Sequence, residues 1–233
     1  MKVLVAVKSC QKDRDQGCHA AIRETWGKSL PAWVDVCFFI GGHEKPSNLE
    51  TDEIHFQVGD DYSQGLVHKI RATFSWAAER GYDFVFFCDT DTYIVSPYWE
   101  QSGFEEFDYC GYSCSRYGNE ATKFGKLYPA GNPILPPPWD PVNLSMLYVY
   151  VGGGGYFLSR RALDYLIKQQ IGPITPEDLW VGQILGPLIE KGEMRGGQLQ
   201  KFQDQAFFHF GAGTKRPRPN PADLIRQKYR ECK

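Results

Sequence analysis

The chain has 233 residues, of which 42% are hydrophobic and 15% aromatic, and its formal net charge is -2 at pH 7. This length and composition suit one large α/β domain, or two small ones, with a sizeable core. The small net charge argues against a protein that binds nucleic acid through its overall charge. No apolar stretch reaches the length of a membrane-spanning helix.

Strand and helix patterns alternate through the first hundred residues. Strands are expected over residues 2–7, 34–40, 53–58 and 84–88, and helices over residues 19–26 and 66–80, the second of which stops at Gly81. This alternation predicts a layered α/β sheet. Ligands of such sheets bind at the carboxyl ends of the strands.

The pattern weakens over residues 103–143, where aromatic residues are scattered among Gly and Pro, and a long functional or mobile loop is expected there. Order returns over residues 149–159, which include four consecutive glycines, and a helix is expected over residues 160–170. Thr175-Pro176-Glu177-Asp178 has the pattern of a helix start, with a hydroxyl cap, a proline and two acids. No repeat or linker is present, so a single domain over residues 1–233 is expected.

The chain contains seven cysteines, an odd number, without the close spacing of a zinc site. Cys37 and Cys88 lie in apolar runs and are expected to be packing residues. Cys110 and Cys114 could pair, but nothing requires it. We therefore expect reduced thiols and a soluble, cytoplasmic protein. The alternative is a Golgi-lumenal domain from which a membrane anchor has been removed.

An apolar run ends abruptly in two acids, Asp89 and Asp91, with Thr90 between them. Residues two apart in an extended chain point the same way, so the two carboxylates would face one point in space. A divalent cation with oxygen ligands relieves their repulsion, and it can also hold a diphosphate. Taken alone, the pair is more often a solvated acidic turn. The other motifs of the chain favour the metal-binding interpretation instead.

Several motifs follow one another in a fixed order. They are Ala21-Ile22-Arg23-Glu24-Thr25-Trp26, Asp61-Tyr62-Ser63-Gln64-Gly65-Leu66, Cys88-Asp89-Thr90-Asp91-Thr92, Gly152-Gly153-Gly154-Gly155-Tyr156, Glu177-Asp178-Leu179-Trp180-Val181-Gly182 and Phe207-Phe208-His209-Phe210. Together they resemble the inverting β-1,3-glycosyltransferases, which include β-1,3-galactosyltransferases, β-1,3-N-acetylglucosaminyltransferases and fringe proteins. The resemblance spans about residues 3 to 209. It implies a GT-A fold, a Rossmann-like three-layer sandwich around a mostly parallel mixed sheet.

The resemblance also implies an activity. A hexose or N-acetylhexosamine would move from a UDP-sugar to an acceptor hydroxyl on a glycan or glycoconjugate, forming a β-1,3 linkage. The expected cofactor is Mn²⁺, with Mg²⁺ possible. By position, Asp91 resembles the main metal ligand, Asp89 its supporting acid and His209 the late metal-binding histidine. Asp178 resembles the catalytic base that takes the acceptor's proton.

Further donor contacts are implied by the same resemblance. Arg23 and Lys69 match basic residues on the donor side, and Thr90 stands in the middle of the metal motif. Gly153 and Gly154 would let the donor approach the backbone. The chain departs from the usual pattern at His19, where the family has arginine. The absence of the stem and disulfide-rich features of secretory-pathway relatives favours a bacterial- or virus-like member.

Each of these residues has a simpler explanation. His209 between phenylalanines is by itself more often a core histidine, and Asp178 more often a helix-start acid. Two other functions also remain open. One is a sugar-nucleotide or glycan-binding module without turnover, against which the presence of Asp178 argues. The other is a transferase acting on nucleic acid, which the basic carboxyl-terminal tail permits and the overall charge does not suggest.

Overall fold

The structure is a computed structural model that describes residues 1–60, 65–111, 114–116, 148–150, 155–171, 177–199, 207–209 and 219–232. The strands of its main sheet are β1 (Val3–Ser9), β2 (Val34–Ile40), β3 (Glu53–His55), β4 (Phe84–Asp89), β6 (Tyr109–Gly111), β9 (Tyr156–Ser159) and β10 (Gly196–Gln198). They lie in the order β10-β6-β9-β4-β1-β2-β3. Only β9 runs antiparallel to its neighbours within these seven strands. The expected mostly parallel mixed sheet is confirmed.

Two small sheets accompany the main one. In the first, β5 (Thr92–Ile94) pairs antiparallel with β11 (Phe207–His209). In the second, β7 (Cys114–Arg116) pairs antiparallel with β8 (Tyr148–Tyr150). In the first small sheet, β5 begins just after the Asp89-Thr90-Asp91 segment.

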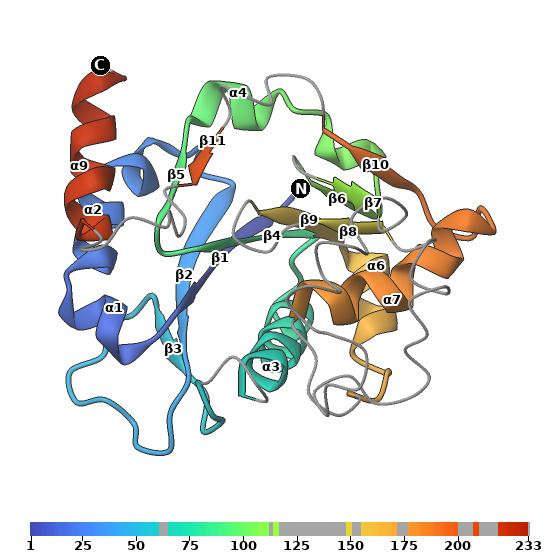
Figure 1. The fold of residues 1–233 in the computed structure, drawn as a ribbon, viewed down its shortest axis with the longest axis horizontal. Helices are drawn as coiled ribbons and strands as arrows, with labels where there is room; N and C mark the ends of the chain where they lie inside the picture. The colour runs from blue at the N-terminus through green and yellow to red at the C-terminus, as the bar shows by residue number, and fades with distance from the viewer. Residues whose placement is uncertain are drawn as a thin grey trace.

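Helices cover both faces of the main sheet (Figure 1). One face carries α3 (Gly65–Glu79), α6 (Arg160–Leu166) and α7 (Glu177–Glu190). The other carries α2 (Cys18–Glu24), the 3₁₀ turn η1 (Trp26–Ser29), α4 (Ser96–Glu100), the 3₁₀ turn η2 (Phe104–Glu106) and α9 (Pro221–Glu231), with the short α1 (Gln11–Asp15) leading into α2. The arrangement is a three-layer α/β sandwich.

The central strands are buried on both faces because their residues alternate between two cores. Leu4 and Ala6 of β1 pack with α3, whereas Val3, Val5 and Val7 pack on the α2 side. All five are fully buried. This explains why β1 reads as a continuous apolar run rather than as an alternating one.

The second half of the chain differs from expectation in two places. Residues 109–111, expected to lie in a loop, form β6 inside the main sheet. The ordered stretch over residues 149–159 contains two strands, β8 and β9, which belong to different sheets. Gly155 precedes β9 with a φ of +85°, and a Cβ built there would lie 2.3 Å from the Phe86 ring. Glycine is therefore required where the chain enters the sheet.

Two of the expected elements also end earlier in the structure than the sequence predicts. The third strand ends at His55 rather than at residue 58. The helix expected over residues 160–170 is α6, which ends at Leu166 and is capped by the Ser159 hydroxyl accepting from the Ala162 N–H. Cys110 is a free thiol, so the pairing with Cys114 is not formed.

Candidate active site at the carboxyl ends of β1 and β4

The candidate site lies where the order of the strands reverses. From β1 the chain moves outward through β2 to β3, and then returns to place β4 on the opposite side of β1. In doubly wound sheets, ligands bind at the carboxyl ends of the strands that flank such a reversal. The register aligns Lys8 of β1 with Asp89 of β4 at this end.

Lys8 joins two acidic segments that lie far apart in the sequence. Its Nζ lies 2.9 Å from Asp89 Oδ1 and 2.5 Å from Glu177 Oε1, in the first turn of α7. The Lys8 and Glu177 side chains are each 7% exposed, whereas that of Asp89 is 34% exposed. Burial alone would lower the pKa of Lys8, but the charges of Asp89 and Glu177 outweigh it and raise that pKa well above its usual value. Lys8 is therefore a cation at neutral pH.

Strand β11 of the first small sheet brings His209 close to the acidic segment. The register of β11 on β5 pairs His209 with Thr92, the residue directly after Asp91. The structure describes the backbone of His209. Asp91 is half-buried, and the Thr90 hydroxyl donates to Asp13 Oδ2 at 2.8 Å, which ties the turn to α1. Of the three expected metal ligands, Asp89 ends β4, Asp91 directly precedes β5 and His209 lies on β11, the strand paired with β5.

A metal ion in this position would need additional ligands from elsewhere. Among the described side chains, which do not include that of His209, no group of three or more His, Cys, Asp and Glu residues is arranged to hold a metal ion. Divalent ions that bind nucleotides take only one or two protein carboxylates and complete their shell with phosphate oxygens and water. The Asp91 carboxylate and the position of His209 fit this kind of open site.

Tyr156 of β9 pairs with Phe87 of β4, two residues before Asp89. Its ring stacks on Phe87 at 5.4 Å, and the residue is fully buried. Its hydroxyl oxygen has no hydrogen-bond partner in the described part of the protein. Burial raises the pKa of Tyr156, and the negative charges of Glu177, Asp178 and Asp89 raise it further.

The expected catalytic base, Asp178, lies in the first turn of α7 and is half-buried. It follows Glu177, which is 5% exposed. Successive helix residues point in directions about 100° apart, so Asp178 points in a different direction from Glu177, whose side chain contacts Lys8. The structure thus brings the segment of Asp178 to the same end of the sheet as Asp89. Gly153 and Gly154 lie outside the described residues.

The two basic residues expected on the donor side are paired with carboxylates. Lys69 of α3 is buried, forms an ion pair with Asp60 and donates to the Ser9 carbonyl at 2.6 Å. Arg23 of α2 holds Asp52 through two hydrogen bonds of 2.9 and 2.6 Å. Their role as donor contacts stays a prediction. Their role in holding the loop before β3 and the segment before α3 is visible.

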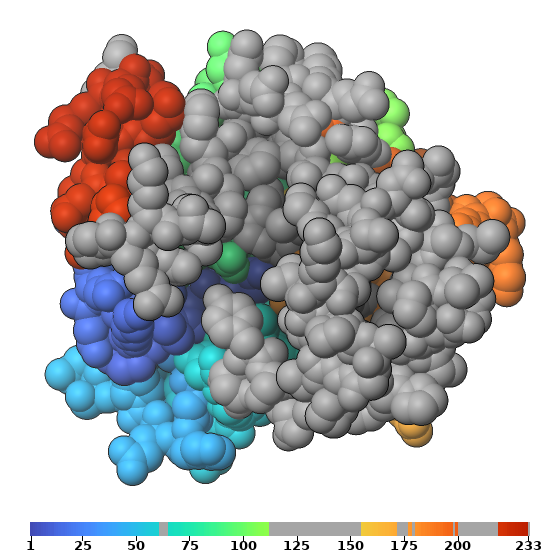
Figure 2. All heavy atoms as spheres, viewed as in Figure 1, coloured from blue at the N-terminus to red at the C-terminus, as the bar shows by residue number. Residues whose placement is uncertain are grey.

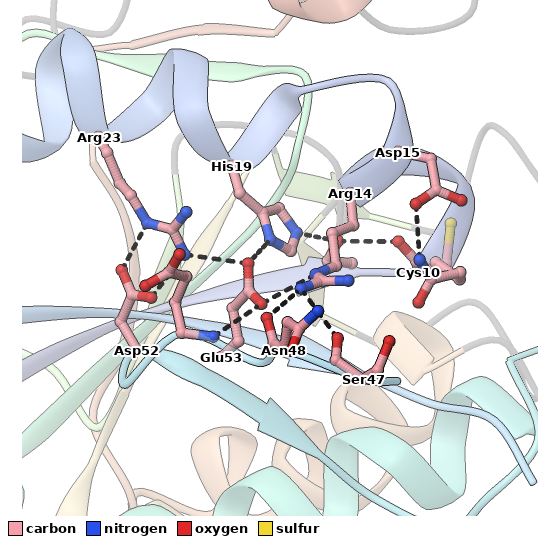
Figure 3. Close-up of polar contacts among 12 residues, drawn as sticks. Cys10, Arg14, Asp15, His19, Arg23, Ser47, Asn48, Asp52 and Glu53 are labelled. Carbon is pink, nitrogen blue, oxygen red and sulfur yellow. Dashed lines mark hydrogen bonds and ion pairs between the residues drawn. The ribbon is translucent and has the colours of Figure 1, made fainter. Parts of the chain in front are cut away.

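A polar network lies on the other side of β1, between α2 and β3 (Figure 3). His19 Nδ1 lies 2.7 Å from Glu53 Oε1, and His19 Nε2 lies 2.6 Å from Ser9 Oγ. Arg14 Nε donates to Glu53 Oε2 at 2.9 Å, and Arg23 donates to Oε1 at 3.0 Å. The arrangement has the order of a Ser–His–acid triad. However, Ser9 and His19 are only 3% and 2% exposed, so the network is structural rather than catalytic.

This network gives a structural role to His19, the residue at which the sequence differs from the motif that it otherwise resembles. Burial alone would raise the pKa of Glu53, but hydrogen bonds from His19 and Arg23 lower it to about 2. Burial lowers the pKa of His19 in spite of its bond to Glu53. His19 is therefore a neutral imidazole that donates from Nδ1 to the carboxylate and accepts from the Ser9 hydroxyl at Nε2.

Sequence reasoning missed Lys8, Glu177 and Tyr156 as members of the candidate site. The available signal was Lys8 itself, a cation at the end of an otherwise apolar central strand. Tyr156 gave no signal, because an aromatic residue in a strand is ordinary core material. The contribution of Glu177 depends on a partner 169 residues away in the sequence.

Part of this end of the sheet can be seen in a space-filling view. Atoms in the colours of β1 and of the β4–β5 segment are visible near the middle of the face drawn in Figure 2. Asp89 and Asp91, at this end of the sheet, are both half-buried. In the described ranges, no helix combines the length and the apolar character needed to cross a membrane.

Comparisons with known proteins add no family assignment. A scan against models of protein families finds no match to this chain, and a search of curated proteins finds no significant relative.

Proposed function

We propose that the protein is a metal-dependent inverting glycosyltransferase with a GT-A fold. It transfers a hexose or N-acetylhexosamine from a UDP-sugar to an acceptor hydroxyl of a glycan, and the bond formed is a β-1,3 linkage. The proposal rests on the order of the motifs and on the geometry of the carboxyl ends of β1 and β4.

One observation carries the proposal. Three segments that are widely separated in the sequence converge on one end of the sheet: Asp89–Asp91, Glu177–Asp178 and the strand that carries His209. Simple helix-start acids and core histidines have no reason to gather in this way. A donor site and a base must both face the sugar that is transferred, so their proximity supports a transferase.

The residues would share the work as follows. Asp91 and His209 would hold Mn²⁺, and Asp89 would support the donor side. When bound, the ion supplies positive charge that neutralises the departing diphosphate. Asp178 would accept the proton of the acceptor hydroxyl as that oxygen attacks the anomeric carbon. A single displacement of this kind inverts the anomeric configuration.

The test is an assay of donor use. The protein is incubated with Mn²⁺ and a panel of nucleotide sugars, and the release of UDP is measured with and without chelator. The expected result is metal-dependent release from one UDP-sugar, increased by glycan acceptors. No release from any donor, together with no binding of UDP, would overturn the proposal.

Asp178→Asn separates a transferase from a binding module. The amide keeps the size of the side chain but cannot accept the acceptor's proton, so transfer should fall about 10²–10⁴-fold while UDP affinity is retained. Asp223→Asn is the matched control, because Asp223 is also a first-turn acid, on α9. Equal behaviour of the two variants would identify Asp178 as a helix-start acid. UDP binding without turnover in the parent would favour the binding module.

A further inference from the structure

The ammonium group of Lys8 is the contact between the two acidic segments of the candidate site. It lies 2.9 Å from Asp89 Oδ1 and 2.5 Å from Glu177 Oε1. Residue Lys8 itself is only 8% exposed. A buried cation with two carboxylate partners from different elements has a defined position, because each ion pair restricts the other.

Each partner of Lys8 has an acidic neighbour that is assigned a role in the reaction. Asp89 is two residues before Asp91, and Glu177 directly precedes Asp178. One acid of each pair therefore faces Lys8, and the chain next to it carries the acid assigned to the substrate side. The distance between the two assigned acids depends on where Lys8 holds their neighbours.

Electrostatics makes the same contact necessary. Asp89, Asp91, Glu177 and Asp178 bring four carboxylates to one end of the sheet, and like charges at short range repel. Lys8 lies between one member of each pair. If the ammonium group were removed, Asp89 and Glu177 would be partly buried carboxylates that repel each other. The turn after β4 would then move away from the first turn of α7.

Lys8 also has no freedom to leave this position at low cost. Its strand, β1, is hydrogen-bonded on both sides, by β2 and by β4. The next residue, Ser9, accepts a hydrogen bond from Lys69 through its carbonyl and contacts His19 through its hydroxyl. The ammonium group is thus presented from a strand that is paired on both sides.

We propose that Lys8 is a positioning residue that fixes the separation between the metal-side acid Asp91 and the base Asp178. This inference rests on the proposed transferase function. Lys8 does not touch the reacting atoms in this scheme; it acts through Asp89 and Glu177. The turnover number should therefore depend on both ion pairs of Lys8, while the donor affinity should depend more on the pair with Asp89 than on the pair with Glu177.

The kinetic test uses three variants of the full chain. Glu177→Gln removes one ion pair and leaves Lys8 on Asp89, so kcat should fall about 10²-fold, as for a displacement of about 1 Å, with the donor KM little changed. Lys8→Met should lower kcat at least as much and raise the donor KM. Lys8→Arg keeps the charge and should restore most of the turnover. Rates are normalised to the number of UDP sites.

Lys2→Met is the control. Lys2 directly precedes β1 and also forms an ion pair with an aspartate. Its Nζ lies 3.5 Å from Asp35 Oδ2, however, and its side chain is 47% exposed. Its removal should leave kcat within about twofold, as expected for a surface pair. Normal turnover of both Glu177→Gln and Lys8→Met in an active parent would overturn the positioning role and leave the proposed function standing.

A second readout does not depend on activity. Hydrogen exchange of peptides that cover residues 88–94 and 177–185 reports the opening of the two segments. In Glu177→Gln, exchange should increase in both peptides, because the segments are coupled through Lys8. An increase confined to residues 177–185 would overturn the coupling. If exchange increases in both peptides of Glu177→Gln but the parent protein transfers no sugar, the Lys8 contact is supported and the transferase function is refuted.

If Lys8→Met does not fold, Glu177→Gln still decides the question. It retains Lys8, the Asp89 ion pair and the size of the side chain. Both the kinetic and the exchange outcomes are defined for this variant alone.

Discussion

Glu53→Gln probes the buried network between α2 and β3. Glu53 accepts hydrogen bonds from His19 at 2.7 Å, Arg14 at 2.9 Å, Arg23 at 3.0 Å and the Glu50 N–H at 3.2 Å. Its side chain is only 2% exposed. Glutamine keeps the size but removes the charge, and it turns an N–H donor toward groups that are themselves donors.

The expected loss is about 3 kcal/mol in the free energy of unfolding. Breaking one partner of a buried charged network costs about 3–5 kcal/mol, and glutamine retains one acceptor oxygen, which places the value at the lower end. For a domain of this size, a loss of about 3 kcal/mol lowers Tm by roughly 6–12 °C. Thermal and urea unfolding, followed by circular dichroism, measure both quantities.

Glu24→Gln is the matched control for this experiment. Glu24 also pairs with an arginine, Arg226, at 3.0 Å, but its side chain is 58% exposed. Its replacement should cost at most about 1 kcal/mol. If Glu53→Gln and Glu24→Gln change stability equally, the buried network does not stabilise the fold as reasoned here.

Three further predictions follow from described contacts. Because burial lowers the pKa of His19 in the folded protein, the unfolded chain binds a proton first as the pH falls through about 6.5, and the free energy of unfolding should decrease below that pH. Between pH 5 and 7.5, the free energy of unfolding should therefore change less steeply with pH in His19→Gln than in the parent. Gly155→Ala should cost several kcal/mol, since its Cβ would meet a core ring at 2.3 Å, whereas Gly192→Ala, with φ +72° and open space, should cost about 1–2 kcal/mol; urea unfolding compares them. Asp91→Ala should abolish manganese-dependent UDP binding in calorimetry, and parent-like binding would place the metal ligand elsewhere.

Local sequence patterns identified the central strands of the sheet and the start of α7. Strands β1, β2 and β4 were predicted because their residues are continuously apolar, and burial on both faces of a central strand requires that pattern. The placement of Asp89 at the end of β4 followed from the same run. The acids in the first turn of α7 were predicted from helix-start chemistry, which is also local.

The tertiary structure alone decided which distant segments meet. Strand β6 was hidden in a Gly- and Pro-rich stretch, because three residues paired with β9 and β10 need no periodic pattern of their own. The insertion of β9 antiparallel between β4 and β6 also left no local trace.

The candidate site depends on the same long-range pairing. Sequence reasoning placed Asp89, Asp178 and His209 in one site through a resemblance, and not through any property of the residues between them. The structure shows which contacts join their segments: Lys8 contacts Asp89 and Glu177, and β11 pairs with β5 beside Asp91. A salt bridge across 169 residues is a property of the sheet order, which is set by the packing of the whole chain rather than by any segment of it.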